Sequence, residues 1–202
     1  MAMDDKNMPV MDHIIELRRR LLIVVIFFLI AFIAGFFLAA PLITYLMDTP
    51  TAKDLPMNAF KMTDPLRVFM TFAFAIALTL TGPVILYQLW AFIRPGLHEN
   101  EQKATLAYIP LAFILFLGGI AFSYFILFPY IVQFMGKLAE RLHITEQYGI
   151  NEYFLFMFQI TIPFGFLFQL PVVVMFLTRI GVITPEVLGR IRKYAYFVLL
   201  VI

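Results

Sequence analysis

The sequence predicts an all-α membrane protein, and three observations lead to this fold class. Hydrophobic residues make up 62% of the 202 residues and charged residues only 14%, whereas soluble domains carry about 45–50% and ~25%. The mean hydropathy is +0.91. The apolar residues also form long runs without a single charge, and a helix of roughly 20 such residues crosses a bilayer. We therefore expect a polytopic bundle of membrane-spanning helices.

Four charge-free runs are long enough to span a bilayer, and a fifth begins at the end of the sequence. The complete runs are 21–47, 68–93, 104–136 and 153–178, and the incomplete one is 194–202. The first run exceeds the roughly 7–15 apolar residues of a signal peptide. The last is too short to cross ~30 Å as a helix. We expect one integral membrane domain over 1–202, truncated in its fifth span.

Prolines and a capping pair punctuate these runs. Asp64 and Pro65 place a capping side chain and a first-turn proline before the second span, a common start of a helix. A proline inside a helix removes one backbone hydrogen bond and tends to kink it. Such prolines are Pro83, Pro129, Pro163 and Pro171. Kinked spans of unequal length favour a curved, concave bundle.

Lysine and arginine are divided unevenly between the two sides of the membrane. Ten lie in the N-terminal tail and in the connections 94–103 and 179–193, and five lie in the remaining connections. Short cytoplasmic loops collect Lys and Arg. The distribution therefore predicts a cytoplasmic N-terminus.

Signatures of enzymatic or metal chemistry are sparse. The chain has no cysteine and three histidines, and these lack the H-E-x-x-H spacing of a zinc site. Neither a G-x-S-x-G elbow nor a phosphate-binding glycine loop is present. The net charge of +2 is too small and too scattered to favour nucleic acid. We expect no catalytic residue, metal or cofactor.

The spans hold glutamine rather than ionisable residues. Gln169 lies deep in the fourth span between two prolines, and Gln159 and Gln133 lie nearer the ends. A helix–helix hydrogen bond is one reading, worth about 0.6 kcal/mol on average, and a functional site is the other. Both stay open for Gln169. The lack of Asp, Glu, Lys or Arg inside the spans argues against a proton-coupled pump.

Acidic residues stand out on the side where bases would be expected. In YQLWAFIRPGLHENEQK (87–103), Glu99 and Glu101 follow a Pro-Gly break, and MDHIIELRRRLL (11–22), a short amphipathic helix candidate, contains Glu16. Glu16 can pair with Arg19 or Arg20 on a helix, for about 0.2–0.5 kcal/mol. A better guanidinium ligand could replace so weak a pair. Glu99 and Glu101 point about 200° apart on a helix, so at most one of them joins Glu16.

Five segments carry a resemblance over nearly the whole chain. They are HIIELRRRLL (13–22), PVILYQLWAFIRPGLHENE (83–101), FSYFILFP (122–129), IPFGFLFQLPVVVMFLTRIGVITPE (162–186) and RKYAYF (192–197). In this order they resemble the TatC family, the multispanning core of the twin-arginine translocase, and they look nearest to Gram-positive versions.

The resemblance implies a six-helix, cup-shaped protein of the bacterial plasma membrane with both termini in the cytoplasm. It further implies recognition of signal peptides that bear two consecutive arginines on folded cargo. Single-span subunits of the TatA/TatB type would then be recruited, within a larger complex that includes other copies of this chain, for export driven by the proton-motive force. No enzymatic activity is implied.

The resemblance also implies roles for particular residues. The two carboxylates of the family's recognition patch fall on Glu16 and Glu101. Neighbouring family positions are Arg18, Phe92, Pro95 and Leu97, with Gln88 and Tyr124 close by in the motifs. Many members carry a glutamate where this chain has Gln169, whose amide cannot hold a charge. Two rival readings of the whole chain are a small-solute transporter or channel, and a scaffold that only gathers single-span helices.

Overall fold

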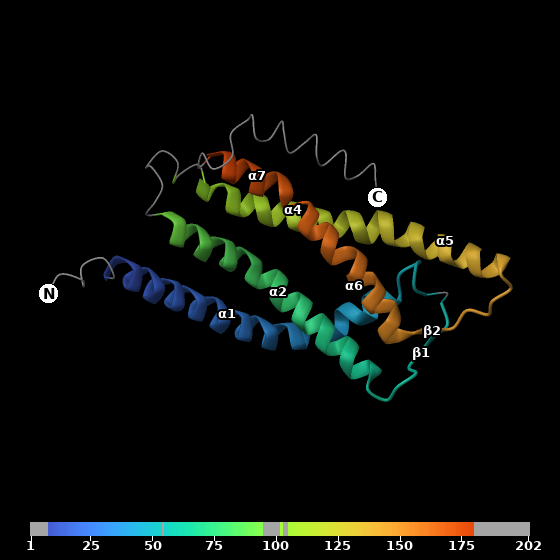
Figure 1. Ribbon diagram of the computed structural model, residues 1–202. Coiled ribbons are helices and arrows are strands. Elements are labelled where there is room, and N and C mark those ends of the chain that lie inside the picture. Colours follow the sequence, from blue (N-terminus) through green and yellow to red (C-terminus); the bar gives the residue numbers. More distant parts are fainter. Residues whose placement is uncertain (1–7, 54, 95–101, 103–104, 180–202) are drawn as a thin grey trace.

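The computed structural model describes residues 8–53, 55–94, 102 and 105–179. These residues contain four apolar helical segments long enough to cross a membrane, which confirms the predicted all-α membrane fold with four complete spans (Figure 1). The start of a fifth span at 194–202 lies outside the described residues. The helices are α1 (Met8–Met47), α2 (Asp64–Ile93), α4 (Tyr108–Phe122), η2 (Ser123–Leu127), α5 (Phe128–Arg141), α6 (Ile150–Leu167) and α7 (Leu170–Arg179).

The helices pack as two groups that α6 joins. α1 lies along α2, while α4 contacts α7, and α6 packs against both α2 and α4 (Figure 1). Two short strands, β1 (Met57–Asn58) and β2 (Tyr148–Gly149), pair in parallel and tie the connection after α1 to the connection after α5. This pairing lies at one end of the bundle, the end away from the last residue of α2, Ile93 (Figure 1).

The packed core lies toward the end with the β1–β2 pair and is aromatic. Phe72, Phe128 and Phe154 are almost fully buried. The Phe72 and Phe154 rings meet edge-to-face with centroids 4.9 Å apart, and the Phe128 and Tyr153 rings do so at 5.5 Å. Such pairs contribute about 0.5–1.5 kcal/mol beyond burial. Elsewhere large apolar side chains such as Phe37 face outward. The exposed apolar area is larger than soluble proteins show, and it is suited to contact with lipid.

The first helix differs from the sequence prediction. α1 runs without a break from Met8 to Met47, so the short N-terminal helix expected before the first span is continuous with the helix of that span. Forty residues rise about 60 Å, twice the ~30 Å hydrocarbon core. Glu, Leu and Arg all favour helix, and the charges around Glu16 therefore end the apolar run without ending the helix.

The predicted cap of α2 is also corrected. Thr63 is the N-cap and Asp64 the first helical residue, with Pro65 following it. The Asp64 carboxylate, 1% exposed, accepts the backbone N–H of Lys61 at 2.8 Å through Oδ2. The carboxylate therefore fixes the turn before the helix rather than the helix's own amides.

Two of the four prolines change the local helix. Before Pro129 the chain forms a π-turn, η2, in which the Phe128 N–H donates to the Ser123 carbonyl. This wider turn makes room for a residue that clashes with an α-helical neighbour. Before Pro171 the fourth span breaks at Phe168 and Gln169, between α6 and α7. The helices continue through Pro83 and Pro163.

Two glycines allow helices to approach closely. A Cβ on Gly35 would lie 2.6 Å from the Ala73 carbonyl oxygen of α2, and one on Gly119 would lie 2.7 Å from the Phe164 carbonyl oxygen of α6. A Cβ on Gly118 would meet nothing within 4 Å. Of these two adjacent glycines, only Gly119 therefore lies against a neighbouring helix.

This difference gives a matched stability test. Gly119→Ala should lower the free energy of unfolding by about 1–3 kcal/mol, because the methyl group forces α4 and α6 apart. Gly118→Ala should leave it unchanged or slightly raise it, since alanine favours helix over glycine. Thermal unfolding in detergent micelles measures both. Equal loss from the two variants would contradict the α4–α6 contact at Gly119.

Candidate functional site

The polar site predicted around Glu16 is built by three residues from two helices. Arg20 lies one turn after Glu16 on α1, and its Nε and Nη2 both donate to Glu16 Oε1, the former at 3.0 Å. Its Nη1 donates to Gln88 Oε1 on α2 at 3.2 Å. This confirms the predicted pairing of Glu16 with Arg20 and adds a link to α2. The Glu16 side chain is 34% exposed and that of Arg20 22%, so water reaches both.

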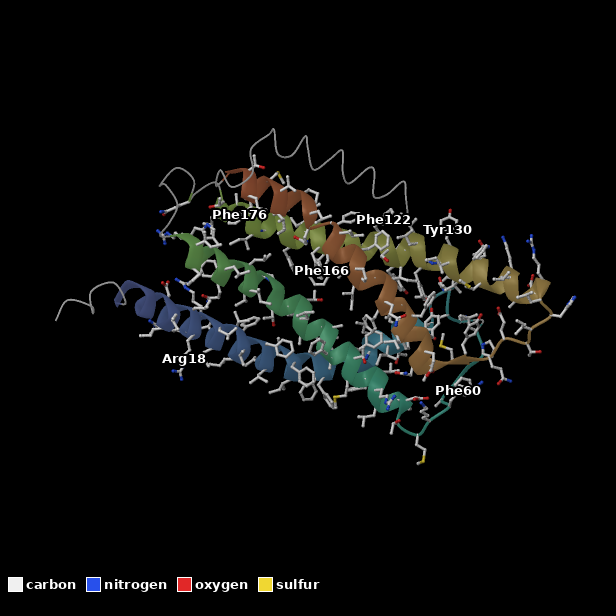
Figure 2. All side chains as sticks on the ribbon, viewed as in Figure 1. Arg18, Phe60, Phe122, Tyr130, Phe166 and Phe176 are labelled. Carbon is white, nitrogen blue, oxygen red and sulfur yellow. The ribbon has the colours of Figure 1, made fainter. Side chains whose placement is uncertain are left out.

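Arg18 and Arg19 lie on the same turn but are exposed. Arg18 points away from the other helices (Figure 2). The structure therefore separates the three consecutive arginines. Arg20 faces α2 and the carboxylate, while its two neighbours present their charges to the surroundings of α1.

Hydrogen bonds join the residues on the two sides of the connection between α2 and α4. Trp90 Nε1 donates to Thr105 Oγ1 at 3.0 Å in a buried bond, and Thr105 Oγ1 also lies 3.3 Å from the Gln102 carbonyl. Arg94 Nε donates to Gln102 Oε1 at 3.0 Å, and the Arg94 guanidinium lies 5.5 Å from the centroid of the Trp90 ring. The residues that flank the loop are thus held together at the end of α2.

The loop's own predicted site residues lie outside the described residues. These are Pro95, Leu97 and Glu101, together with Glu99. Gln102, which follows Glu101 directly, is placed beside Arg94. Phe92 lies on the last turn of α2 and is half-buried. Glu16 contacts Gln88, one turn before Phe92, only through Arg20.

An apolar cavity of about 400 Å³ opens beside Trp90. Its walls come from α2, α4, the end of α6, the α6–α7 break and α7, and they include Leu86, Leu89, Trp90, Tyr108, Phe166 and Phe176. Phe166 projects between the two groups of helices, and Phe176 lies on α7 (Figure 2). The cavity lies at the same end of α2 as Gln88. The same helix also packs against α1.

Gln169 lies at the break before Pro171 and also borders this cavity. Its Nε2 donates to the Ala112 carbonyl of α4 at 2.8 Å. A carbonyl oxygen has two lone pairs, so it accepts this bond in addition to its helical one. Of the two readings of Gln169, the structure shows the helix–helix hydrogen bond. Tyr124 is elsewhere, in η2, with its ring 6.3 Å from that of Phe128 in the core.

The predicted polar residues therefore do not form one cluster. Gln88 belongs with Arg20 and Glu16, Gln169 with Ala112, and Tyr124 with the aromatic core. Among the described residues, no three His, Asp or Glu side chains are close enough to share a metal ion.

A bundle of long apolar helices with a carboxylate–guanidinium pair at one end is a multispanning membrane protein. Comparisons with known proteins identify the family. The family described as Sec-independent protein translocase protein (TatC) matches residues 12–202. The chain belongs to the TatC family.

Curated relatives and solved structures agree with this assignment. A TatC of Halalkalibacterium halodurans is 72% identical over 99% of this chain and 79% of its own length. TatCy of Bacillus subtilis is 60% identical over 97% and 77%. A crystal structure of the twin-arginine translocase receptor TatC in a detergent has a TM-score of 0.79 at 33% identity, and the match covers 90% of this chain and 82% of that one. The predicted likeness to Gram-positive versions is confirmed.

The family fixes the class of function. The chain is a multi-pass membrane protein and a translocase component, and it is not an enzyme. Sequence reasoning found Glu16 and Arg20 but missed three hydrogen bonds. These are the bonds from Arg20 to Gln88, from Trp90 to Thr105 and from Arg94 to Gln102. The sequence did contain a signal for the last two bonds. Gln102 and Thr105 are polar residues that follow the loop, so their side chains can bond to the end of α2.

The Gln169 hydrogen bond can be tested against a second glutamine of the same span. Gln169→Leu should lower the stability of the bundle by about 0.6–2 kcal/mol, because the α4–α7 contact loses its polar link. Gln159→Leu should have little effect, since Gln159 is exposed. Thermal unfolding in micelles compares the two. A larger loss from Gln159→Leu would contradict the assignment.

Proposed function

We propose that this chain is the signal-peptide receptor of a twin-arginine translocase in the bacterial plasma membrane. Glu16 and Glu101 would each bind one guanidinium of an arginine pair. The observation that carries the proposal is the bonding of Glu16: its carboxylate already accepts two N–H groups from one guanidinium. A site that holds the side chain of Arg20 in this way has the chemistry to hold an arginine of a ligand.

Selectivity for arginine follows from the same bonding. A guanidinium offers parallel N–H groups in a fixed plane, whereas lysine offers one compact ammonium. Two charge-assisted hydrogen bonds to one carboxylate are stronger and more directional than one. A ligand with two lysines would therefore lose part of the binding at each carboxylate, although its charge is the same.

Glu101 is proposed as the second carboxylate because of its place in the chain. It directly precedes Gln102, which Arg94 holds at the end of α2. Gln88, the partner of Arg20, is on the same helix six residues before Arg94. Both acidic segments are therefore anchored to one stretch of α2. Two consecutive arginines need two acceptors a few ångströms apart, which this anchoring favours.

The apolar segment of a signal peptide would occupy the cavity beside Trp90. That cavity is lined almost wholly by apolar side chains, and burial stabilises by about 25 cal/mol per Å² of apolar surface. It borders the same end of α2 as the carboxylate site. A peptide could thus place its arginines at the membrane surface and its apolar residues in the bilayer.

The remaining parts of the proposal concern orientation and partners. The excess of Lys and Arg on one side supports a cytoplasmic N-terminus, which puts Glu16 where unexported cargo is made. Single-span TatA/TatB-type subunits and further copies of this chain are the proposed partners. The many outward-facing apolar side chains offer surface for both and for lipid. A small-solute transporter gains no support from the family or from an apolar cavity.

The two proposed carboxylates can be tested with a labelled twin-arginine peptide and the protein in nanodiscs. Glu16→Ala or Glu101→Ala should each raise the Kd of the peptide about tenfold, a loss of roughly 1.4 kcal/mol, because one guanidinium loses its acceptor. Glu99→Ala is the matched control and should have much less effect. Equal loss from all three variants would show general charge attraction and contradict the assignment of Glu101.

Trp90 offers an independent optical test of the cavity. It is the only tryptophan of the chain, so intrinsic fluorescence reports its surroundings alone. Binding of the twin-arginine peptide should shift the emission to shorter wavelength, because the peptide's apolar segment displaces water or lipid headgroups from the cavity. A peptide with the same arginines and a polar segment should leave the emission unchanged. An identical shift with both peptides would contradict this placement.

A further inference from the structure

We propose that Arg20 is a resident guanidinium that occupies Glu16 in the empty receptor, and that it has to leave before an arginine of the ligand binds there. The inference rests on the proposed function, because it concerns the same carboxylate. All three nitrogens of the Arg20 guanidinium are engaged: Nε and Nη2 by Glu16, and Nη1 by Gln88. Arg20 therefore makes within the chain the contact that a ligand arginine would make.

Occupation by Arg20 has two physical consequences for a ligand. Nε and Nη2 of Arg20 both occupy Oε1, so a second guanidinium cannot bind both carboxylate oxygens, and two guanidinium charges that share one carboxylate repel each other. Arg20 also cancels the negative charge of Glu16, so the pair attracts a cationic peptide less than the free carboxylate would. Both effects lower the affinity of the receptor for its ligand.

The alternative role for Arg20 is a clamp that positions Glu16 by joining α1 to α2. The packing of these helices does not depend on it. The Phe36 and Phe69 rings meet with centroids 4.6 Å apart, those of Phe28 and Phe74 meet at 5.5 Å, and Gly35 sits against Ala73. Glu16 is also part of a continuous helix. Its place is fixed without Arg20.

Gln88 explains how Arg20 can leave at low cost. Its amide oxygen accepts Nη1 at 3.2 Å, so the displaced side chain keeps one partner on α2. The Arg20 side chain is also 22% exposed, and water can solvate the nitrogens that Glu16 releases. The exchange swaps one guanidinium for another on the carboxylate, and the charge of the displaced Arg20 is then stabilised by the Gln88 amide and by water.

The test compares Arg20→Gln with Arg19→Gln in nanodiscs of neutral phosphatidylcholine, with a labelled twin-arginine peptide as probe. Both variants remove one positive charge from neighbouring positions, but only Arg20 touches Glu16. Arg20→Gln should lower the Kd roughly three- to tenfold, since Glu16 is then vacant. Arg19→Gln should change it less than twofold. Unchanged or weaker binding by Arg20→Gln would overturn the proposal and favour the clamp.

A second pair of variants separates this proposal from the proposed function. In a Glu16→Ala background, adding Arg20→Gln should no longer tighten binding, because the carboxylate that it frees is gone. Equal tightening with and without Glu16 would overturn the role of Arg20 as an occupant of that carboxylate. If Glu16→Ala alone leaves binding unchanged, it is the proposed function that fails at this residue, whatever Arg20→Gln does.

Discussion

The hydrocarbon core of a bilayer offers no water, so every backbone N–H and C=O within it needs a partner inside the protein. This constraint makes the spans helical and leaves few places where they can deviate. The two deviations observed both precede prolines, at the π-turn before Pro129 and at the break before Pro171. At the second, Gln169 is free of regular helix geometry and donates to the Ala112 carbonyl. A backbone defect thus becomes a polar link between α4 and the fourth span.

The two ends of the bundle are held by different kinds of contact. Aromatic rings and the β1–β2 pair hold one end, beside a cavity of about 550 Å³ lined by the connection after α1, η2 and α5. At the other end α2 contacts α1 on one side and borders the cavity beside Trp90 on the other. At this end a few polar contacts link neighbouring segments, namely Arg20 with Gln88, Trp90 with Thr105 and Arg94 with Gln102. These contacts can change without disturbing the aromatic core.

Composition and spacing predicted the features that depend on one segment of the chain, and they missed the contacts that depend on how two segments are packed. Four spans follow from charge-free runs, and the Glu16–Arg20 pair follows from i,i+4 spacing on a helix. The link from Arg20 to Gln88 depends on how α1 and α2 are rotated against each other, which neither segment encodes alone. The continuous α1 was missed because a charge ends an apolar run but not a helix. Gly119 and Gly118 look equal in sequence, and only the neighbouring helix distinguishes them.

A resident guanidinium also bears on why a ligand would need two arginines. If the first ligand arginine replaces Arg20 on Glu16, one guanidinium is exchanged for another, and the exchange yields less free energy than binding to a vacant carboxylate would. A larger share of the affinity then comes from contacts that the empty receptor does not make, namely the second arginine at Glu101 and the apolar segment beside Trp90. A peptide with one arginine would keep the exchange and the apolar contact but would lose the second carboxylate. Under this arrangement the receptor responds to the pair, although each carboxylate binds only a single side chain.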